Sequence, residues 1–436
     1  MRTNFDHIDV TVVGGGLAGM AASIHLARAG FQVLCLEADP GGIDPVGESL
    51  DWSAPELLRV LGLPMHHLLQ EEIATWKRHV ILKIRGGGAQ HYIPSDWLGR
   101  PPFNIELRTI HVDRTRLNQA VREIVLRDGV TLVSDKVVTV ERDGKWTNAV
   151  LTESGSKVCS PWFIDASGSA TSLFPRAFEL PVHEYGPRKV AIWDYFSVGE
   201  SVEGTTLHAD GGGPPYMEWM WQIPIHSKTV SVGYVTTGEI IKEKRKLGKT
   251  IEQIYIEQLA HYDDLRDLYS DSHTASPRTT SYRCRAYGKI AGPNWLVVGE
   301  AASMVDPMTS NGVTAALRHA EEASSLIARY RKHRQLPWLA RTLYGRRVLD
   351  LATFFNVRIE KVVYDWPIRN RIGALTAGDV YTIPAWSINH LYSRFQPRGF
   401  AGTMLFGFLL STLRAALNIF YWFCKRSRQT SPVCAT

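Results

Sequence analysis

The 436-residue chain has few cysteines and no pattern that pairs them. The chain has no CxxC motif, so neither a zinc knuckle nor a disulfide framework is indicated, and we expect no metal site and a reducing, cytoplasmic setting. The N-terminus also lacks an apolar run long enough for a signal peptide before its first predicted strand, so we expect no export by that route. The five widely spread cysteines are Cys35, Cys159, Cys284, Cys424 and Cys434.

The sequence also has no internal repeat and no low-complexity tract. Apolar residues make up 44% and charged residues 21%, which is typical of a globular protein and excludes a disordered or fibrous chain. The length predicts either two domains or one large α/β unit with a companion sheet. A net charge of +6 alone names no partner, and we expect no nucleic acid.

Residues 8–37 predict a strand, a glycine-rich turn, a helix and a second strand. The turn carries the GxGxxG pattern at Gly14, Gly16 and Gly19. The first glycine allows a tight turn, the second lets backbone approach a pyrophosphate, and the third lets the helix pack closely on the strand. Glu37 ends the second strand, 23 residues after Gly14, where a carboxylate can accept hydrogen bonds from ribose hydroxyls. The unit is typical of a dinucleotide site, for FAD or NAD.

Two later strands end in turns of the same kind. Residues 162–174 close on a tight turn in the sequence DASG, and residues 294–320 contain a strand, a turn and a helix that begins near Gly312. Because ligands bind at the carboxyl ends of parallel strands, three such ends favour one large cofactor held by a discontinuous domain. The further cofactor-binding residues predicted here are Arg114, Asp165, Gly168, Gly299, Glu300, Asp306 and Gly312.

Residues 74–94 and 188–236 are richer in strand alternation and predict a second, antiparallel sheet. Trp219 and Trp221 stand in strand alternation within it, and we expect Pro224 to end their strand. Pairs of large rings most often fill a sheet core, so alone they indicate packing rather than chemistry.

Together these pieces resemble the flavin-dependent halogenases, which are tryptophan-halogenase-like FAD oxidoreductases and share a fold with aromatic hydroxylases. The resemblance covers roughly residues 8–330. Its most specific motif is WxWxIP, formed by Trp219, Trp221, Ile223 and Pro224. The other matching segments are GES, with Glu48 and Ser49 as cofactor-binding residues, DASG with Asp165, and GEAASMVDPMTSNG.

The resemblance implies an α/β fold in three parts. These are a Rossmann-like FAD-binding domain of the aromatic hydroxylase type, a substrate domain built on an antiparallel β-sheet, and a helical C-terminal region. The predicted bounds are 1–75, 105–187 and 285–330 for the first, 76–104 and 188–284 for the second, and 331–436 for the third.

The resemblance also implies a catalytic lysine on the strand after GES. Lys77 follows Trp76 and lies 29 residues after Glu48, which is similar to the family spacing. Lysines in alternating strands more often point to water, and Lys83 is the alternative if the register differs.

A member of this family uses reduced FAD (FADH2), O2 and a halide, chloride or bromide, to make hypohalous acid. The ammonium of Lys77 would hold or react with this oxidant beside an electron-rich carbon. Trp219 and Trp221 would separate the flavin from the substrate, while backbone N–H groups from Ser310 to Gly312 would hold an anion. A separate flavin reductase, or free flavin reduced by NAD(P)H, would supply FADH2.

One departure from the family pattern bears on the substrate. Tryptophan halogenases carry a glutamate two residues after an Asp-Pro pair, where this chain has Thr309. Threonine cannot replace that carboxylate, which argues against free tryptophan and favours the branch acting on phenols, pyrroles, or carrier- or lipid-linked aromatics. Asn311 also alters the expected surroundings of the halide.

Three other functions stay open. A flavin-dependent monooxygenase would hydroxylate an aromatic or a peptide tryptophan without needing halide. A flavin oxidoreductase similar to geranylgeranyl reductases would act on prenyl chains and would work without O2. A non-enzymatic flavoprotein or a membrane-docking module is disfavoured, because the strand-end acids and Lys77 would then have no function.

The C-terminal segment 399–428 is apolar and flanked by basic residues. Arg414 and Asn418 interrupt the apolar run, which disfavours a membrane-spanning helix. We expect an interfacial helix on an anionic membrane surface, at the inner face of a membrane, with a helix that covers the substrate domain as the alternative. A lipid-like substrate follows only from the first of these.

Overall fold

The computed structural model describes residues 7–39, 46–85, 89–92, 108–199, 201, 203–209, 216–270, 276–364 and 399–426. The chain forms two compact units, each assembled from separated segments. The first unit comprises Met1–Ala74, Thr109–Glu184 and Cys284–Ala352, and the second comprises Thr75–Arg108, Tyr185–Arg283 and Thr353–Thr436. Residues 331–436, expected as a third region, are therefore divided between the two units.

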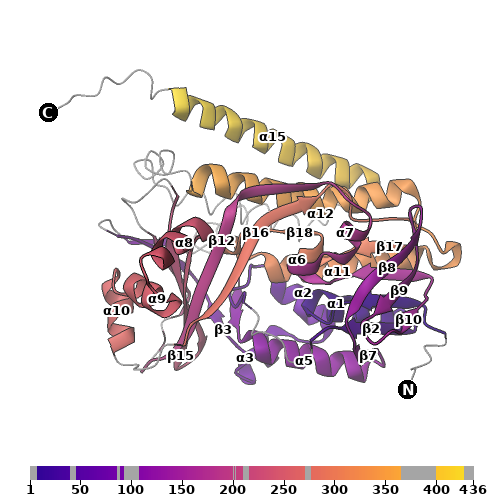
Figure 1. Cartoon of the computed structure of the whole chain (residues 1–436), viewed down its shortest axis with the longest axis horizontal. Coiled ribbons are helices and arrows are strands. Elements are labelled where there is room, and N and C mark those ends of the chain that lie inside the picture. Colours follow the sequence, from indigo (N-terminus) through magenta and orange to yellow (C-terminus); the bar gives the residue numbers. More distant parts are fainter. Residues whose placement is uncertain are drawn as a thin grey trace, which may run out of the picture. The chain divides into compact units, whose positions relative to one another are not determined.

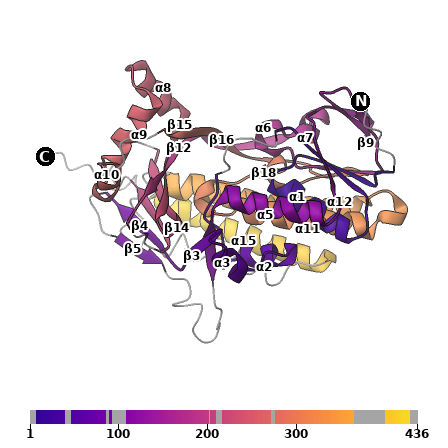
Figure 2. The same ribbon diagram turned by 90° about the horizontal axis from the view of Figure 1, so that it is seen from below.

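The first unit is built on a five-stranded parallel sheet with the order β17-β11-β1-β2-β7. Figure 1 labels its strands β17, β2 and β7. The residues of β1 and β11 are all buried, as expected for strands covered on both faces. Helix α1 packs beside α11 and α5 (Figure 2). The strands are β1 (Val10–Val13), β2 (Val33–Glu37), β7 (Thr131–Ser134), β11 (Trp162–Asp165) and β17 (Trp295–Val297).

Local sequence explains where the main helices begin. Asp113 caps α5 (Arg114–Arg127) because its carboxylate accepts the backbone N–H groups of Thr115 and Arg116. Helices α1 (Leu17–Arg28) and α11 (Gly312–Arg329) instead begin without any side-chain cap. The other helices of this unit are α2 (Ala54–Leu61), α3 (Met65–Gln70), α6 (Gly168–Thr171), α7 (Leu173–Ala177), η1 (Gly299–Ala301), η2 (Pro307–Thr309) and η3 (Arg331–His333).

The remaining strands of the first unit lie outside the parallel sheet. An antiparallel sheet has the order β10-β9-β8. Its strands are β8 (Val137–Asp143), β9 (Trp146–Thr152) and β10 (Lys157–Val158). The unit also contains β6 (Thr109–Val112) and β18 (Ser303–Met304), which are not part of this sheet.

The second unit is built on a sheet whose strands run in the order β16-β12-β15-β14-β13-β4-β5. Every strand pair here with a recorded register is antiparallel except β13 with β4, which is parallel, whereas the sequence predicted an antiparallel sheet. Strand β4 comes from a chain segment far from β13, and only such a long connection lets two strands pair in parallel. The strands of this sheet are β4 (Val80–Ile84), β5 (Ala89–Tyr92), β12 (Val182–Ser197), β13 (Thr205–Ala209), β14 (Trp219–His226), β15 (Thr229–Thr237) and β16 (Arg278–Tyr287). Strand β3 (Ala74–Lys77) lies outside this sheet.

One face of this sheet forms an apolar core with three helices. Ile192, Met220 and Tyr234 lie side by side across β12, β14 and β15, and they pack with residues of the helices. Because strand side chains alternate, the neighbours of Met220, Trp219 and Trp221, lie on the opposite face. The three helices are α8 (Gly238–Lys246), α9 (Ile251–Leu259) and α10 (Asp263–Ser270).

The C-terminal elements are α12 (Trp338–Arg358), a π-helical turn η4 (Ile359–Tyr364) and α15 (Gly399–Arg426). Among the described residues, no helix combines the length and apolarity that crossing a membrane requires. Residues 427 and 428 of the predicted membrane-binding segment lie outside the described residues.

Candidate functional site

The glycine turn after β1 leaves the start of α1 uncovered. A Cβ at Gly14, whose φ is +109°, would lie 2.3 Å from the carbonyl oxygen of Ala166, and one at Gly19 would lie 1.8 Å from that of Gly14. These two glycines therefore permit close packing of turn, strand and helix. A Cβ at Gly16 would meet nothing within 4 Å. The unpaired N–H groups at the start of α1 thus face open space, which suits a phosphate.

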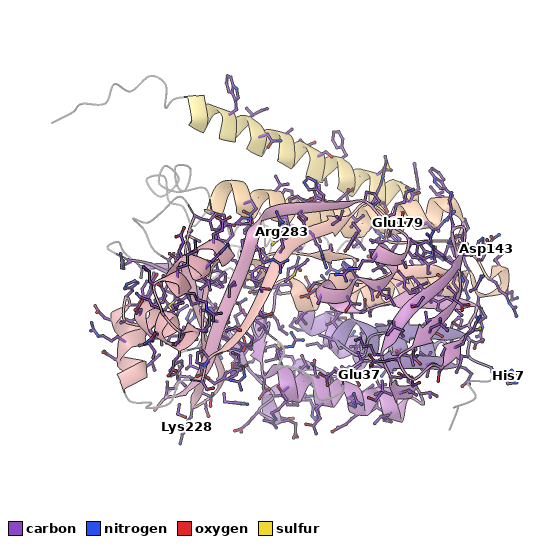
Figure 3. The ribbon with its side chains drawn as sticks, in the orientation of Figure 1. His7, Glu37, Asp143, Glu179, Lys228 and Arg283 are labelled. Atoms are coloured by element: carbon purple, nitrogen blue, oxygen red, sulfur yellow. The ribbon has the colours of Figure 1, made fainter. Side chains whose placement is uncertain are left out.

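The acid expected at the ribose lies at the end of β2 but has a basic partner. Glu37, labelled in Figure 3, accepts a hydrogen bond on Oε2 from Arg122 Nη1 at 2.6 Å. Arg122 is on α5, and no motif in the sequence singled it out. The carboxylate lies beside the glycine turn, since a Cβ at Gly15 would lie 2.6 Å from the Glu37 carboxyl carbon. The ion pair with Arg122 holds it there.

The GES segment is tied to two predicted site residues. Arg114 Nη1 donates to the carbonyl oxygens of Val46 at 3.0 Å and Gly47 at 3.3 Å. The hydroxyl of Ser310 donates to that of Ser49 at 3.2 Å, which joins two segments 261 residues apart. Ser310 has φ +54°, a left-handed conformation in which its loop turns into the start of α11. Glu48 is buried at the same segment.

Asp165 holds the turn after β11. Its two carboxylate oxygens accept the backbone N–H groups of Ser167 at 2.9 Å and Phe174 at 2.7 Å. Burial raises the pKa of this carboxyl, while these hydrogen bonds oppose the rise. Gly168 follows with φ +76°, which a glycine adopts without strain. Asp165 therefore shapes the backbone at this strand end.

The third strand end is held by a histidine that sequence reasoning missed. Gly299, with φ +60°, donates its N–H to Nδ1 of His319 at 3.2 Å. Glu300 is exposed and accepts a hydrogen bond from the Ser169 hydroxyl at 3.0 Å. This contact joins the second and third strand ends.

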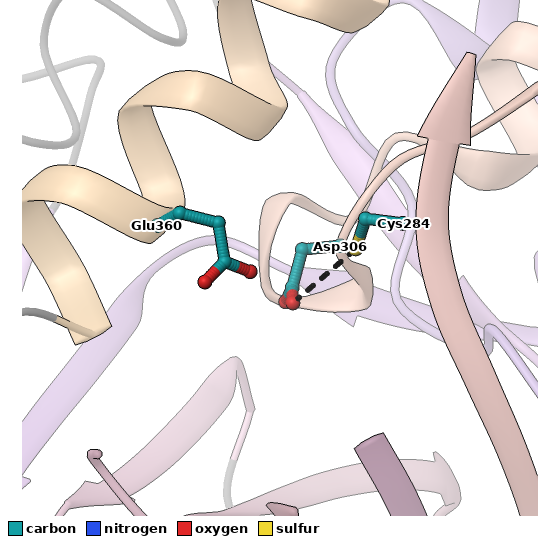
Figure 4. A group of neighbouring side chains, drawn as sticks. All are labelled: Cys284, Asp306 and Glu360. Atoms are coloured by element: carbon teal, nitrogen blue, oxygen red, sulfur yellow. Dashed lines mark hydrogen bonds between the residues drawn. The ribbon is translucent and has the colours of Figure 1, made fainter. Parts of the chain in front are cut away.

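Asp306 and Gly312 frame the loop before α11. Asp306 accepts the N–H of Met308 at 3.0 Å and so caps η2, and Cys284 Sγ lies 3.8 Å from its Oδ2 (Figure 4). Gly312 begins α11, and its N-cap Asn311 makes no side-chain capping hydrogen bond. The N-terminus of this 18-residue helix therefore offers N–H groups to an anion or an electron-rich ring edge.

In the second unit, the two candidate lysines have opposite surroundings. Lys77 ends β3 and is 2% exposed. Lys83 has a side chain that is 38% exposed and forms an ion pair with Asp264. Of the two candidate lysines, Lys77 is therefore the buried one and Lys83 the one in contact with solvent.

The two tryptophans are buried on one sheet face, with ring centroids 6.0 Å apart. Trp221 lies over Gly233 of the neighbouring strand, where a Cβ would come within 2.0 Å of the ring, and its Nε1 donates to the Ser231 hydroxyl at 3.1 Å. Trp219 Nε1 donates to the Tyr364 hydroxyl at 3.0 Å. Strand β14 does not end at Pro224; it continues to His226 through a register shift.

The first unit fits FAD. The open space over Gly16, the uncovered start of α1 and the turns after β11 and β17 are the features that a dinucleotide bound at the carboxyl edge of a parallel sheet requires. Gly14, Gly16 and Glu37 would hold its phosphates and ribose, and FAD when bound would supply the two-electron chemistry. These features define a dinucleotide-binding fold.

The chain belongs to the tryptophan halogenase family, whose model matches residues 107–342, more than half of the chain. The lycopene cyclase family model matches residues 9–195. This places the protein among flavin-dependent oxidoreductases, and the halogenases of this family use FADH2, O2 and halide.

Individual relatives include enzymes of two kinds. The tryptophan 2-halogenase of Chondromyces crocatus is 28% identical over 82% of this chain and 69% of its own length. The flavin-dependent halogenase armH5 of Armillaria mellea is 28% identical over 73% of this chain and 64% of its own length. The menaquinone reductase of Mycolicibacterium smegmatis is 28% identical over 73% of this chain and 76% of its own length. The chain thus spans less than the full length of the halogenases that it matches.

Solved structures agree on the fold. The flavin-dependent brominase Bmp2 has a TM-score of 0.73 at 20% identity, over 94% of this chain and 100% of that chain. PqsL, a probable FAD-dependent monooxygenase from Pseudomonas aeruginosa, has a TM-score of 0.70 at 15% identity, over 85% of this chain and 100% of that chain. The α/β FAD-binding fold expected from the sequence is confirmed, and at these identities the likeness establishes the fold alone.

Proposed function

We propose that this protein halogenates an electron-rich aromatic compound, using FADH2, O2 and chloride or bromide. The observation that carries the proposal is Lys77, which is buried at the end of its strand in a chain of the halogenase family. An exposed lysine at this position would have argued against it, because an oxidant held there would escape into water.

The overall chemistry balances without a metal. O2 accepts two electrons from the reduced flavin and two from the halide; one oxygen atom leaves as water and the other enters hypohalous acid. The Lys77 amine then holds this acid by a hydrogen bond or forms a haloamine with loss of water. Transfer of the halogen to the aromatic carbon releases the proton of that carbon. Trp219 and Trp221 separate the acceptor from the flavin and so suppress hydroxylation.

The proposed substrate is a phenol, a pyrrole, or a carrier- or lipid-linked aromatic rather than free tryptophan. Support comes from Thr309, which stands where tryptophan halogenases carry a carboxylate. A ring activated by its own hydroxyl or ring nitrogen needs less help from a protein base. Ser310, hydrogen-bonded to Ser49, belongs to the loop proposed to hold the halide. A separate flavin reductase is the proposed source of FADH2.

The test supplies chemically reduced FAD, O2 and bromide together with a small phenol, and compares Lys77→Ala with Lys83→Ala. We expect bromophenol from the wild type and from Lys83→Ala, and a loss of about 100-fold or more in Lys77→Ala. Bromination that survives in Lys77→Ala would remove this lysine from the reaction. Hydroxylation without bromide would instead favour the monooxygenase function.

A flavin-dependent reductase is the second candidate function, and the menaquinone reductase relatives favour it. Such an enzyme would transfer hydride equivalents to an isoprenoid acceptor without O2. Anaerobic gain of two hydrogens in the prenyl chain of a short-chain menaquinone, measured by mass spectrometry and unchanged in Lys77→Ala, would support the reductase over the halogenase.

We also propose that α15 binds an anionic membrane surface. Six large apolar side chains on this helix are between 49% and 67% exposed. At 100° per residue they fall within about half of the helix circumference, while the buried Thr403 and Leu410 lie on the other side. The six residues are Phe400, Leu405, Phe408, Leu409, Ile419 and Trp422.

The charge of the chain points to the same partner. No Asp or Glu follows Asp379, whereas six Lys and Arg residues do, a number equal to the net charge of the whole chain. The first 379 residues are therefore electrically balanced, and the entire positive excess lies in the segment that contains α15. An exposed apolar face within a basic segment matches the surface of an anionic bilayer.

Vesicle flotation tests this second proposal without any catalysis. We expect the protein to float with vesicles that contain phosphatidylglycerol and to be released by salt, and the double substitution Leu405→Ser and Phe408→Ser to abolish flotation. Leu247→Ser is the control, since Leu247 is 77% exposed on another element. Unchanged flotation of the double variant would reject the proposal. The proposal would also be rejected if the wild type did not bind vesicles and instead formed a dimer that the double substitution dissociates.

A further inference from the structure

The second unit contains a buried ion pair on the sheet face that carries the two tryptophans. Lys189 Nζ lies 2.5 Å from Oε1 of Glu360, and the lysine is 0% exposed. Ala191 pairs with Val235, and Val235 pairs with Trp219. Because Lys189 and Ala191 are two residues apart on β12, Lys189 points to the same side of the sheet as Trp219. Glu360 comes from the π-helical turn η4.

Two tyrosines connect this ion pair to Trp219. Tyr216 donates a hydrogen bond to the second Glu360 oxygen at 2.8 Å, and its ring stacks on that of Tyr364 with centroids 4.5 Å apart and an interplanar angle of 11°. Lys189 Nζ lies 4.2 Å from the centroid of the Tyr364 ring. The Tyr364 hydroxyl accepts the indole N–H of Trp219. Burial raises the pKa of Tyr216, so its phenol keeps the proton that it donates.

The backbone is shaped to admit the carboxylate. Gly186 has φ +61°, and a Cβ there would lie 2.3 Å from the Glu360 carboxyl carbon. A buried ion pair seldom stabilises a fold more than apolar side chains of the same volume would, because both charges lose their water. Its effect here is geometric: it fixes both oxygens of Glu360, the stacked tyrosines and, through Tyr364, one indole ring.

We propose that Lys189, Glu360, Tyr216 and Tyr364 are positioning residues that fix the indole of Trp219, and that this placement directs hypohalous acid to the organic substrate instead of letting it leak. The second part rests on the proposed halogenase function. The proposal gives the turn Ile359–Tyr364 a role that cannot be predicted from the WxWxIP motif.

The decisive variant is Tyr364→Phe, which removes one hydroxyl and keeps the ring that stacks on Tyr216 and faces Lys189. Tyr255→Phe is the matched control: its hydroxyl donates to the Val232 carbonyl oxygen at 2.8 Å, and Tyr255 packs in the core on the opposite sheet face. Reduced flavin, O2 and bromide are supplied with a small phenol and with a phenol attached to dextran, which intercepts oxidant only outside the protein.

We expect Tyr364→Phe to lower the ratio of small-phenol to dextran bromination by about tenfold, at an unchanged rate of flavin oxidation. Tyr255→Phe should leave this ratio as in the wild type. A purely structural loss would lower both products together. An unchanged ratio in Tyr364→Phe, or the same change in Tyr255→Phe, would overturn the proposal.

A second measurement does not depend on halogenation. In protein labelled with 5-fluorotryptophan, Trp219→Phe identifies the fluorine NMR signal of Trp219. We expect Tyr364→Phe and Glu360→Gln to shift this signal and Tyr255→Phe to leave it in place. If the wild type brominates neither phenol, the proposed function fails. The fluorine signals then decide alone whether these residues position Trp219. A Trp219 signal that does not move in Tyr364→Phe and Glu360→Gln would reject the positioning.

Discussion

The backbone N–H of Gly299 donates to Nδ1 of His319, 3.2 Å away, across the strand end that faces the cofactor edge of the sheet. Burial lowers the pKa of His319 to about 3, with the charge of Arg318 adding to the effect. The imidazole is therefore neutral in the folded protein at neutral pH, and its Nδ1 lone pair is available to Gly299.

Stability should depend on pH through this histidine. In the unfolded chain His319 takes up a proton near the ordinary histidine pKa of 6.5, whereas in the folded protein it does so only near 3. Between these pH values the unfolded state binds more protons than the folded state. The free energy of unfolding therefore falls as the pH drops from 6.5 toward 3, and above 6.5 titration of His319 no longer changes it. In His319→Gln, the slope of unfolding free energy against pH should be smaller by up to about 1.4 kcal/mol per pH unit. Urea unfolding at several pH values checks this, and identical slopes would contradict it.

Two glycines of the first turn should respond differently to alanine. Gly16→Ala adds a methyl group to open space, so we expect the protein without cofactor to keep its thermal stability and to lose most of its affinity for FAD. Gly19→Ala places the methyl group against the Gly14 carbonyl oxygen and should destabilise the fold itself. Melting temperatures and FAD titrations of both variants separate the effects. Gly345→Ala, which also meets open space, is the control and should keep FAD affinity.

Gly233→Ala should move Trp221. The added methyl group would overlap the indole ring, and we expect a loss of about 1–3 kcal/mol in unfolding free energy from overpacking. Denaturant unfolding measures the loss, and near-UV circular dichroism should report the changed indole environment. Gly238→Ala is the control at the start of α8, directly after the same strand, where the new Cβ would lie 3.6 Å from its nearest neighbour.

The buried and the exposed ion pairs should differ strongly in energy. Glu360→Gln leaves the Lys189 charge buried without its carboxylate, and we expect a loss of about 3–5 kcal/mol in unfolding free energy. The pair of Arg59 with Glu56 has side chains 60% and 66% exposed, so Glu56→Gln should cost less than about 1 kcal/mol. Adding Lys189→Met to Glu360→Gln should recover much of the first loss. No recovery in the double variant would contradict the charge argument.

The sequence predicted best those features that depend on local chemistry. The GxGxxG turn could be predicted from its spacing, and the tight contact of Gly19 with Gly14 lies within the motif itself. Leu117, Val121 and Ile124 stand at helical spacing in the sequence, and all three are buried on α5. The Ser49 to Ser310 hydrogen bond, in contrast, joins positions that no periodicity relates.

Features that depend on distant segments could not be predicted. Arg122 and His319 are ordinary helix residues until the fold brings them to Glu37 and Gly299. The end of strand β14 was predicted wrongly at Pro224, because a register shift accommodates the proline. Tyr364 meets Trp219 across 145 residues, and only the tertiary structure relates them.

The interleaving of the two units has a consequence for biosynthesis. The last segment of the first unit ends at Ala352, whereas Glu360 and Tyr364, which hold Trp219, belong to the next segment. A nascent chain can therefore complete its flavin-binding half while the tryptophan strand still lacks its tyrosine partner. The order of translation thus allows the first unit to fold before the hydrogen bond between Trp219 and Tyr364 can form in the second.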